Sequence, residues 1–287
     1  MAIIIDGKAV AADIRRELAE KVKVFKADYG ITPTLAVVIV GEDPASQVYV
    51  RNKQRACEEI GFDSIAFPMQ ADVSEDYLLT TIDGLNNNPD IHGILVQLPL
   101  PKHLDEEKIL LAIDPTKDVD AFHPYNVGKL MQGNPAFRPC TPAGVMELLK
   151  RYEIEVAGKE CVIVGRSNIV GKPLSMLMLQ ANGTVTVCHS KTKDLKEVCR
   201  RADILVAAIG KPKFFNEGYI KPGAIIIDVG INRTEDGKLC GDVDFEAVKE
   251  HVSYITPVPG SVGPMTIAML MDNTFKAACN TVTGATI

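Results

Sequence analysis

A tyrosine and a lysine in the first third of the chain have the types and spacing for acid–base chemistry. Tyr49 and Lys53 are four residues apart within segment 44–60, and Pro44 suits the first turn of a helix. Residues at this spacing project from one helix face, so the two side chains can share a proton. A lysine partly removed from water can act as an acid or base. The alternative is a surface lysine whose stem packs on the tyrosine ring.

Two further polar residues, Gln97 and Asp120, fall where α/β sheets hold their ligands. Gln97 directly follows the apolar run 93–96, and Asp120 lies in the polar segment 117–124. In parallel sheets, ligands bind beyond the carboxyl ends of the strands, so both residues are candidates for substrate contacts. The alternative for Asp120 is an aspartate that stabilises a turn or caps a helix.

A turn with two glycines in the second half of the chain indicates a nucleotide site. Gly165 and Gly171 lie between a β-rich run ending at Val164 and a predicted helix. Glycine lets the backbone approach a pyrophosphate, and the N-terminus of the helix offers free N–H groups. The spacing differs from GxGxxG, so an ordinary strand-to-helix corner without a ligand is the alternative.

The residues after the next predicted strand favour NADP over NAD. An NAD site requires an acidic residue about 20 residues after the glycine turn, where it holds the ribose 2′-hydroxyl. Segment 188–192 contains no acid; Ser190 can donate to a phosphate, and Lys191 and Arg166 can neutralise it. The alternative is a solvated basic turn.

Hydrophobic periodicity predicts the elements that must position these residues. The expected helices are 8–28, 44–60, 75–87, a weak one at 105–112, 141–152, 172–182, 195–201 and 265–278. The expected strands are 35–40, 65–67, 93–96, 161–164, 184–188, 204–208 and 224–229. The proline-rich segment 114–139 is expected to form loops. Alternating strands and helices are typical of α/β proteins with parallel sheets.

We therefore predict two α/β domains with the active site in the cleft between them. Residues 1–140 form the catalytic domain, and the C-terminal segment 265–287 packs back on it. Residues 141–264 form a Rossmann-like, nucleotide-binding parallel sheet. A length of 287 residues fits two domains at about 150 residues each.

Composition argues against several other classes of function. A net charge of −6 disfavours non-specific binding of nucleic acid, which needs a basic face. Seven cysteines without a CxxC pair and five histidines without HExxH indicate neither a disulfide framework nor a metal site. No apolar run is long enough for a secretion signal or a membrane span, so we expect a cytoplasmic protein.

Nine segments, in order along nearly the whole chain, resemble the bifunctional methylenetetrahydrofolate dehydrogenase/cyclohydrolase (FolD) family. They are SQVYVRNK at 46–53, GILVQLPLP at 93–101, KDVDAFHP at 117–124, RPCTPAG at 138–144, VGRSNIVGKP at 164–173, CHSKT at 188–192, DVGIN at 228–232, GDVDF at 241–245 and PVPGSVGPMT at 257–266. The resemblance implies two reactions at one site of a homodimer. NADP⁺ oxidises 5,10-methylene-tetrahydrofolate to the 5,10-methenyl compound, which is then hydrolysed to 10-formyl-tetrahydrofolate.

The resemblance also implies roles for individual residues. Lys53 would be the main catalytic residue, with Tyr49 beside it and Gln97 tuning it, and Asp120 would hydrogen-bond the pterin ring. Further folate contacts would come from Leu98, Pro99, Pro259 and Gly260. NADP would be bound by Gly165, Arg166, Ser167, Gly171, Ser190 and Ile231, with Arg166 and Ser190 at the 2′-phosphate.

Two departures from the usual family pattern are Ala121 and Ser261, each of which stands where the family has glycine. A positive φ at Ser261 would add strain. Neither departure removes a reactive group, so we expect the activity to be retained. The alternatives are a dehydrogenase without hydrolase activity, or an inactive nucleotide-binding module. The intact set Tyr49, Lys53, Gln97 and Asp120 argues against the inactive module.

Overall fold

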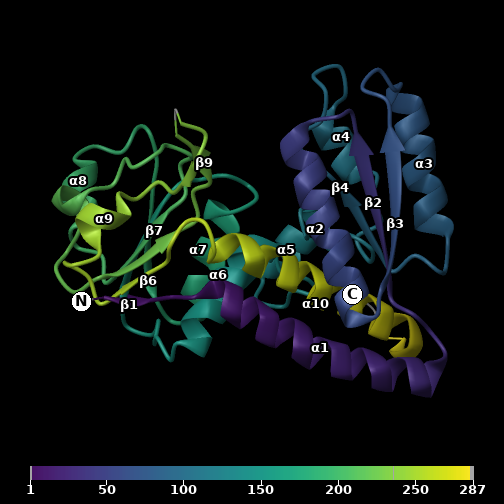
Figure 1. The fold of residues 1–287 in the computed structure, drawn as a ribbon, viewed down its shortest axis with the longest axis horizontal. Helices are drawn as coiled ribbons and strands as arrows, with labels where there is room; N and C mark the ends of the chain where they lie inside the picture. The colour runs from purple at the N-terminus through teal and green to yellow at the C-terminus, as the bar shows by residue number, and fades with distance from the viewer. Residues whose placement is uncertain (1, 235, 285–287) are drawn as a thin grey trace. The chain divides into compact units, whose positions relative to one another are not determined.

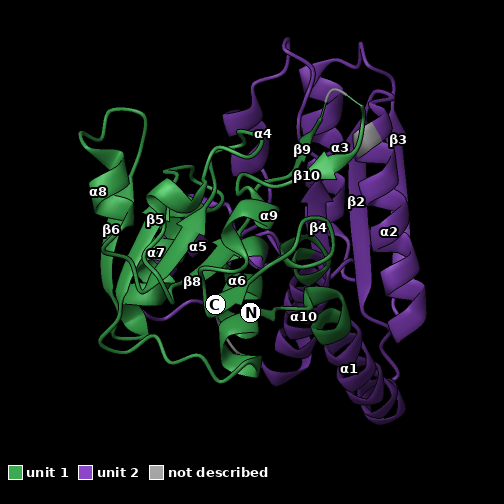
Figure 2. Ribbon diagram, turned by 60° about the vertical axis from the view of Figure 1, so that its left-hand side comes forward, with its two compact units in different colours: residues 1–11, 141–266 green, residues 12–140, 267–287 purple. Residues whose placement is uncertain are grey.

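The computed structural model describes residues 2–234 and 236–284 and divides the chain into two compact units (Figure 2). Unit 1 contains Met1–Ala11 and Thr141–Thr266, and unit 2 contains Ala12–Cys140 and Ile267–Ile287. Three helices run from one unit into the other: α1 (Gly7–Tyr29), α6 (Cys140–Arg151) and α10 (Val262–Thr283).

Unit 2 is built on a three-stranded parallel sheet in the order β3-β2-β4 (Figure 1). The strands are β2 (Thr34–Val40), β3 (Asp63–Met69) and β4 (Gly93–Val96). Every residue of the central strand β2 is buried, which explains its unbroken apolar run, TLAVVIV. Alternate residues of β2 and β4 pack in one apolar core with α3 (Glu75–Asn87) and α4 (Glu106–Leu111).

Helix α2 (Pro44–Ile60) has clear start and stop signals in the sequence. Asp43 caps its first turn, where its carboxylate accepts a hydrogen bond from the Ser46 N–H at 2.7 Å. Gly61 ends it with a left-handed φ of 82°. The helix therefore has the predicted bounds, and it carries Tyr49 and Lys53.

One prediction for unit 2 is wrong. Segment 114–139 was expected to form loops, but it contains helix α5 (Pro124–Met131). Pro124 occupies the first turn, where no backbone donor is needed, and the His123 imidazole accepts from the Tyr125 N–H at 3.1 Å. Here proline starts a helix instead of excluding one.

Unit 1 is built on a six-stranded, wholly parallel sheet in the order β1-β11-β8-β7-β5-β6. The strands are β1 (Ile3–Ile4), β5 (Glu160–Val164), β6 (Thr184–Cys188), β7 (Ile204–Ala207), β8 (Ile225–Asp228) and β11 (Tyr254–Ile255). The chain leaves β5 for β6 and then returns to β7 on the other side of β5. The carboxyl end of β5 is therefore the switch point where doubly wound sheets bind ligands.

The connections of unit 1 are short helices and one hairpin. They are α7 (Gly171–Gln180), α8 (Leu195–Cys199), the 3₁₀ turn Glu217–Tyr219, the strands β9 (Asn232–Arg233) and β10 (Leu239–Cys240), and α9 (Phe245–Val248).

The assignment of the two terminal segments differs from the predicted one. Residues 1–11 belong to unit 1 because β1 pairs with β11, with Ile3 opposite Tyr254. The last helix begins at Val262, not near Pro264, and its residues from Ile267 onward belong to unit 2.

In the two described ranges, no helix is long and apolar enough to cross a membrane. The same residues contain no cluster of His, Cys, Asp and Glu able to hold a metal ion. All seven cysteines are free thiols.

Candidate active site

Lys53 is buried and its amino group has a fixed partner. The side chain lies on α2 with 9% exposure, and its Nζ donates to Gln97 Oε1 at 2.9 Å. Gln97 follows β4 directly, and its own Nε2 donates to the Leu98 carbonyl at 2.8 Å. The second bond turns the amide oxygen toward Lys53. The alternative of an exposed surface lysine is therefore wrong.

Burial changes the protonation of Lys53. Loss of water contact lowers the pKa of its ammonium group, although the nearby Asp120, Cys140 and Cys57 oppose the shift. Burial likewise raises the pKa of the Asp120 carboxyl, against the pull of Lys53. Both shifts favour neutral side chains, so Lys53 is more readily deprotonated than an ordinary lysine.

Asp120 is held in place by the loop around it. The neighbouring Asp118 is buried, and its Oδ2 accepts from the His123 N–H at 2.8 Å and from Asn126 Nδ2 at 2.9 Å. Ala121 follows with a positive φ of 62°, which an alanine adopts only under strain. The Cys140 thiol donates to the carbonyl of the preceding Val119 at 3.4 Å, and the charge of Lys53 acts on the Asp120 carboxylate. Asp120 therefore lies close enough to Lys53 for the two charges to interact.

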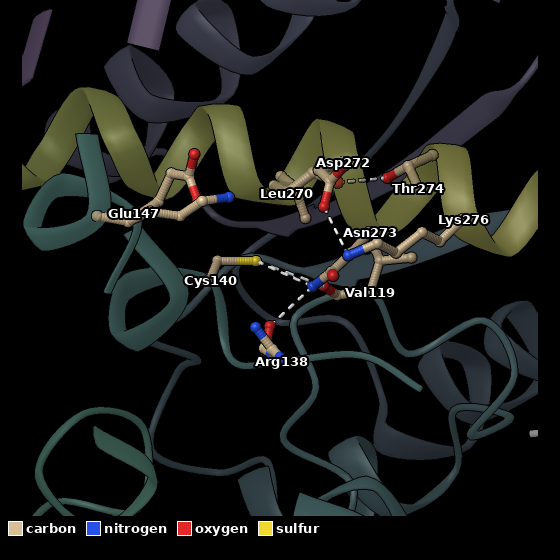
Figure 3. A network of polar contacts seen from close by, with 10 residues as sticks. Val119, Arg138, Cys140, Glu147, Leu270, Asp272, Asn273, Thr274 and Lys276 are labelled. Atoms are coloured by element: carbon tan, nitrogen blue, oxygen red, sulfur yellow. Dashed lines mark hydrogen bonds and ion pairs between the residues drawn. The ribbon is translucent and has the colours of Figure 1, made fainter. Parts of the chain in front are cut away.

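Asn273 and Cys140, which the sequence did not single out, lie in one network of polar contacts with the residue before Asp120 (Figure 3). Asn273 on α10 is 3% exposed, and its Nδ2 donates to the carbonyls of Val119 at 2.9 Å and Arg138 at 2.8 Å. The same group lies 3.7 Å from the sulfur of Cys140. Asn273 therefore ties together the chain segments that carry Asp120 and Cys140.

Tyr49, Leu98 and Pro99 lie near Lys53 or Gln97 along the chain. Tyr49 is 37% exposed and stands one helical turn before Lys53. Leu98 is partly buried, Pro99 is exposed, and the peptide bond between them is cis. All three side chains remain accessible to a ligand.

The glycine turn of unit 1 has no room for a side chain at either of its glycines, Gly165 and Gly171. Gly165 has a φ of 139°, and a Cβ added there would lie 2.2 Å from the Ala208 carbonyl oxygen. A Cβ at Gly171 would lie 2.1 Å from the Gly165 oxygen. The tight turn leads into α7, and Ser167 Oγ accepts from the Val170 N–H at 3.1 Å. Such a turn at the switch point suits the close approach of a pyrophosphate.

Arg166 and Ser190 follow paired positions in adjacent strands. Val164 of β5 pairs with Cys188 of β6, and the Gly165 N–H donates to the Cys188 carbonyl at 2.9 Å. The two polar residues therefore leave the same edge of the sheet, and both side chains are exposed. A cation and a hydroxyl group placed there fit a phosphate group.

The remaining predicted site residues of unit 1 lie in two loops. Ile231, after β8, is 48% exposed, and a Cβ at Gly263 would lie 3.8 Å from its Cδ1. Pro259 is exposed and preceded by a cis peptide bond, and Gly260 has a φ of 113°. Ser261 has no positive φ, so the strain considered for it is absent; its Oγ donates to the Ile5 carbonyl at 3.0 Å.

Comparisons with known proteins agree with this description. Residues 5–120 match the catalytic domain of tetrahydrofolate dehydrogenase/cyclohydrolase, and residues 139–282 match its NAD(P)-binding domain. The chain is 60% identical to the bifunctional protein FolD of Acetivibrio thermocellus, covering 96% of each chain. It is 57% identical to that of Streptococcus thermophilus, covering 99% of this chain and 100% of the relative.

Two solved structures extend the likeness to three dimensions. One is the FolD enzyme of Campylobacter jejuni, with a TM-score of 0.96, 51% identity, and coverage of 98% of this chain and 100% of that one. The other is the Trypanosoma brucei enzyme complexed with NADP and an inhibitor, with a TM-score of 0.94, 41% identity and coverage of 98% of each chain. The chain therefore belongs to the tetrahydrofolate dehydrogenase/cyclohydrolase family.

Proposed function

We propose that this protein is a bifunctional enzyme of one-carbon folate metabolism. It oxidises 5,10-methylene-tetrahydrofolate to the 5,10-methenyl compound with NADP⁺, and it hydrolyses that product to 10-formyl-tetrahydrofolate. The observation that carries the proposal is that Lys53 is buried, hydrogen-bonded to Gln97 and close to Asp120. Relatives at 57–60% identity are named bifunctional FolD proteins, and the T. brucei enzyme was solved with NADP.

Lys53 is the proposed general base of the hydrolysis. The methenyl group is a cation, so a permanently charged ammonium beside it would be unfavourable. Burial lowers the pKa of Lys53, and the neutral amine can take a proton from the attacking water and return it to the leaving nitrogen. Gln97 Oε1, 2.9 Å from Nζ, directs the amine.

Asp120 is the proposed anchor of the pterin ring. Its carboxylate can accept hydrogen bonds from the ring N–H groups, and its pKa is raised by burial, so it can also share a proton there. Tyr49, Leu98, Pro99, Pro259 and Gly260 would complete the folate site, with the accessible Tyr49 ring packing on the substrate.

The glycine turn of unit 1 is the proposed NADP site. NADP⁺ supplies the hydride acceptor of the oxidation when it is bound. Gly165, Ser167, Gly171 and the first N–H groups of α7 would hold the pyrophosphate, and Ile231 would pack against the dinucleotide. Arg166 and Ser190 would bind the 2′-phosphate. Hydride transfer requires the folate and NADP⁺ to be bound at the same time, with the donor and acceptor carbons close together.

Substitution of Lys53 tests the proposal. Lys53→Met is expected to lower the rate of methenyl hydrolysis by about a hundredfold or more, the usual scale of general acid–base catalysis. Some dehydrogenase activity should survive, because hydride transfer depends mainly on positioning. Stopped-flow absorbance follows the appearance of the methenyl product with NADP⁺ and its decay without cofactor. Lys21→Met, which removes an exposed lysine of α1, is the matched control.

The same assay separates the alternatives. An enzyme that forms the methenyl product but never accelerates its decay would be a dehydrogenase alone. A protein that binds NADPH and catalyses neither step would be an inactive nucleotide-binding module. Wild-type hydrolysis in Lys53→Met would leave the proposed mechanism without its base.

The remaining partners follow from the same proposal. The substrates are tetrahydrofolate derivatives, with no role for nucleic acid. The seven free thiols suit the reducing cytoplasm.

We also propose a homodimer, as the resemblance implies. Strand β6 forms one edge of the six-stranded sheet, and Val187 on it is 38% exposed, so this edge offers a surface for a second copy.

A further inference from the structure

Asp242 is a buried acidic residue inside unit 1. It has no exposure, and its Oδ2 accepts from the backbone N–H groups of Ile209 at 2.6 Å and Gly210 at 3.0 Å. Its Oδ1 accepts from the Lys211 N–H at 2.8 Å and from Asn232 Nδ2 at 2.9 Å. Three successive N–H groups that converge on one carboxylate form a nest of the kind that binds anions, with the positive φ of Gly210, 64°, at its centre.

The loop that forms this nest borders the glycine turn. It follows β7, whose neighbour in the sheet is β5. The Ala208 N–H donates to the Val164 carbonyl at 2.9 Å, and the Ala208 oxygen would lie 2.2 Å from a Cβ at Gly165. A shift of residues 208–211 would therefore change the space beside Gly165.

The same carboxylate also holds the segment after β8. Asn232, which donates to Asp242, directly follows Ile231. A Cβ on Gly230 would lie 2.3 Å from the carboxyl carbon of Asp242, so this segment packs directly against the carboxylate. Asp242 thus connects the loops that follow β7 and β8, both at the ligand-binding edge of the sheet.

Asp242 is itself fixed by a second buried carboxylate. Asp228 Oδ1 accepts from the Asp242 N–H at 3.0 Å, and Asp228 Oδ2 accepts from the Val243 N–H at 2.9 Å. Gly241 lies against Asp228, since a Cβ there would be 1.8 Å from Oδ2. With four donors already on its oxygens, Asp242 can act on a ligand only through the loops it holds.

We propose that Asp242 is a positioning residue for the dinucleotide: its carboxylate fills the nest at 209–211 and sets the shape of the loops beside the glycine turn. The inference rests on the NADP site of the proposed function and assigns a further residue to it. It requires no contact between Asp242 and the cofactor.

Asp242→Asn tests this inference with little change of shape. The amide keeps one acceptor oxygen but turns an NH₂ group toward two of the N–H donors, so the nest opens. We expect the Kd of NADPH, followed by its own fluorescence, to rise about tenfold or more, as for the loss of two charge-assisted hydrogen bonds. The hydrolysis of methenyl-tetrahydrofolate needs no dinucleotide, and its kcat/KM should stay within about twofold.

Two further variants make the test decisive. Asp244→Asn, two residues away, changes a carboxylate that does not cap its helix and should leave NADPH binding unchanged. Asn232→Ala removes one donor from Asp242 and should raise the Kd a few-fold, even if Asp242→Asn fails to fold.

The possible outcomes distinguish this inference from the proposed function. Unchanged NADPH binding in a folded Asp242→Asn or in Asn232→Ala would overturn the inference alone. An equal loss of hydrolysis and NADPH binding would also overturn it, since it would indicate general destabilisation. A wild-type protein that does not bind NADPH would overturn both proposals.

Discussion

At the scale of single residues, burial gives Lys53 its chemistry. Because its pKa is lowered mainly by desolvation, the neutral amine becomes available below the ordinary lysine value of 10.5. We predict that the rate constant for methenyl hydrolysis rises with pH as Lys53 loses its proton, with a midpoint below 10.5. Initial rates between pH 6 and about 10, corrected for spontaneous hydrolysis, measure it.

Lys53→Arg provides the control for this pH profile. The guanidinium keeps the charge and the reach but does not lose its proton in proteins, so the rise with pH should disappear. A wild-type profile that is flat, or that falls over this range, would mean that the protonated lysine is the active form.

Arg166 and Ser190 are the proposed ligands of the 2′-phosphate of NADP. If they bind the 2′-phosphate, the double variant Arg166→Ala/Ser190→Ala should lose about thirtyfold or more in kcat/KM for NADP⁺, as for charge-assisted hydrogen bonds. The value for NAD⁺, which lacks that phosphate, should change little. Comparing the two cofactors under identical conditions measures the preference. A wild-type enzyme that prefers NAD⁺, or a variant with unchanged NADP⁺ affinity, would contradict the assignment.

The sequence indicates the reactive residues better than those that hold them. Lys53 can be recognised because it lies one helical turn after Tyr49, and Gln97 because it directly follows a predicted strand. In the structure the two side chains are hydrogen-bonded to each other. Asn273 and Cys140 do not stand out, since an asparagine or a cysteine in a helix has many ordinary roles. Their importance arises from contacts between segments more than 130 residues apart in the chain.

Among the helices, the C-terminal end of α6 contains backbone strain that a single substitution can relieve. Ile154 N–H donates to the Leu149 carbonyl at 2.8 Å and Glu153 N–H to the Lys150 carbonyl at 3.1 Å, which is the Schellman pattern. Glu153 is exposed and occupies the left-handed position with a φ of 54°. A glycine at this position would avoid the steric cost of the left-handed conformation, which is ~1–2 kcal/mol. Glycine also loses more backbone entropy on folding, which offsets ~0.5–1 kcal/mol of that gain.

We therefore predict that Glu153→Gly raises the free energy of unfolding by about 0.5–1 kcal/mol without changing either activity. Urea denaturation followed by circular dichroism measures the difference. Glu153→Ala is the matched control: it removes the same carboxylate but keeps a Cβ in the left-handed conformation. An equal gain in both variants would attribute the effect to charge instead of backbone strain.

The elements that the sequence predicts well are those with local signals. Helix α2 has an aspartate cap, a proline in its first turn and a terminal glycine, and its bounds are as predicted. The two-residue strands β1 and β11 carry no periodicity, because the pattern of a strand needs at least four residues. They are defined by their pairing in the sheet: Ile3 lies opposite Tyr254, and β11 pairs on its other side with β8.

In the molecule as a whole, each unit is built from two separate stretches of the chain. Unit 1 takes its first strand from the N-terminus, and unit 2 takes most of α10 from the C-terminus. Chain direction predicts the return of the last helix, whereas the sequence gives no indication of the N-terminal strand. Pairing between residues about 250 positions apart depends on tertiary structure and has no local signal.

Strand β6 at the edge of the six-stranded sheet suits pairing with a second copy of the chain. The edge strand β6 contains TVTVC, β-branched residues that favour pairing, and it contains no charged residue, proline or glycine that would oppose it. We predict that light scattering at micromolar concentration gives twice the chain mass of 31.1 kDa, and that Val187→Lys restores the mass of a single chain. A lysine on an edge strand blocks pairing because its charge would have to be desolvated. Val24→Lys, at a 61% exposed position of α1, controls for added charge and should leave the dimer intact. A single-chain mass for the wild type would refute the dimer, and a dimeric Val187→Lys would locate the interface on another surface.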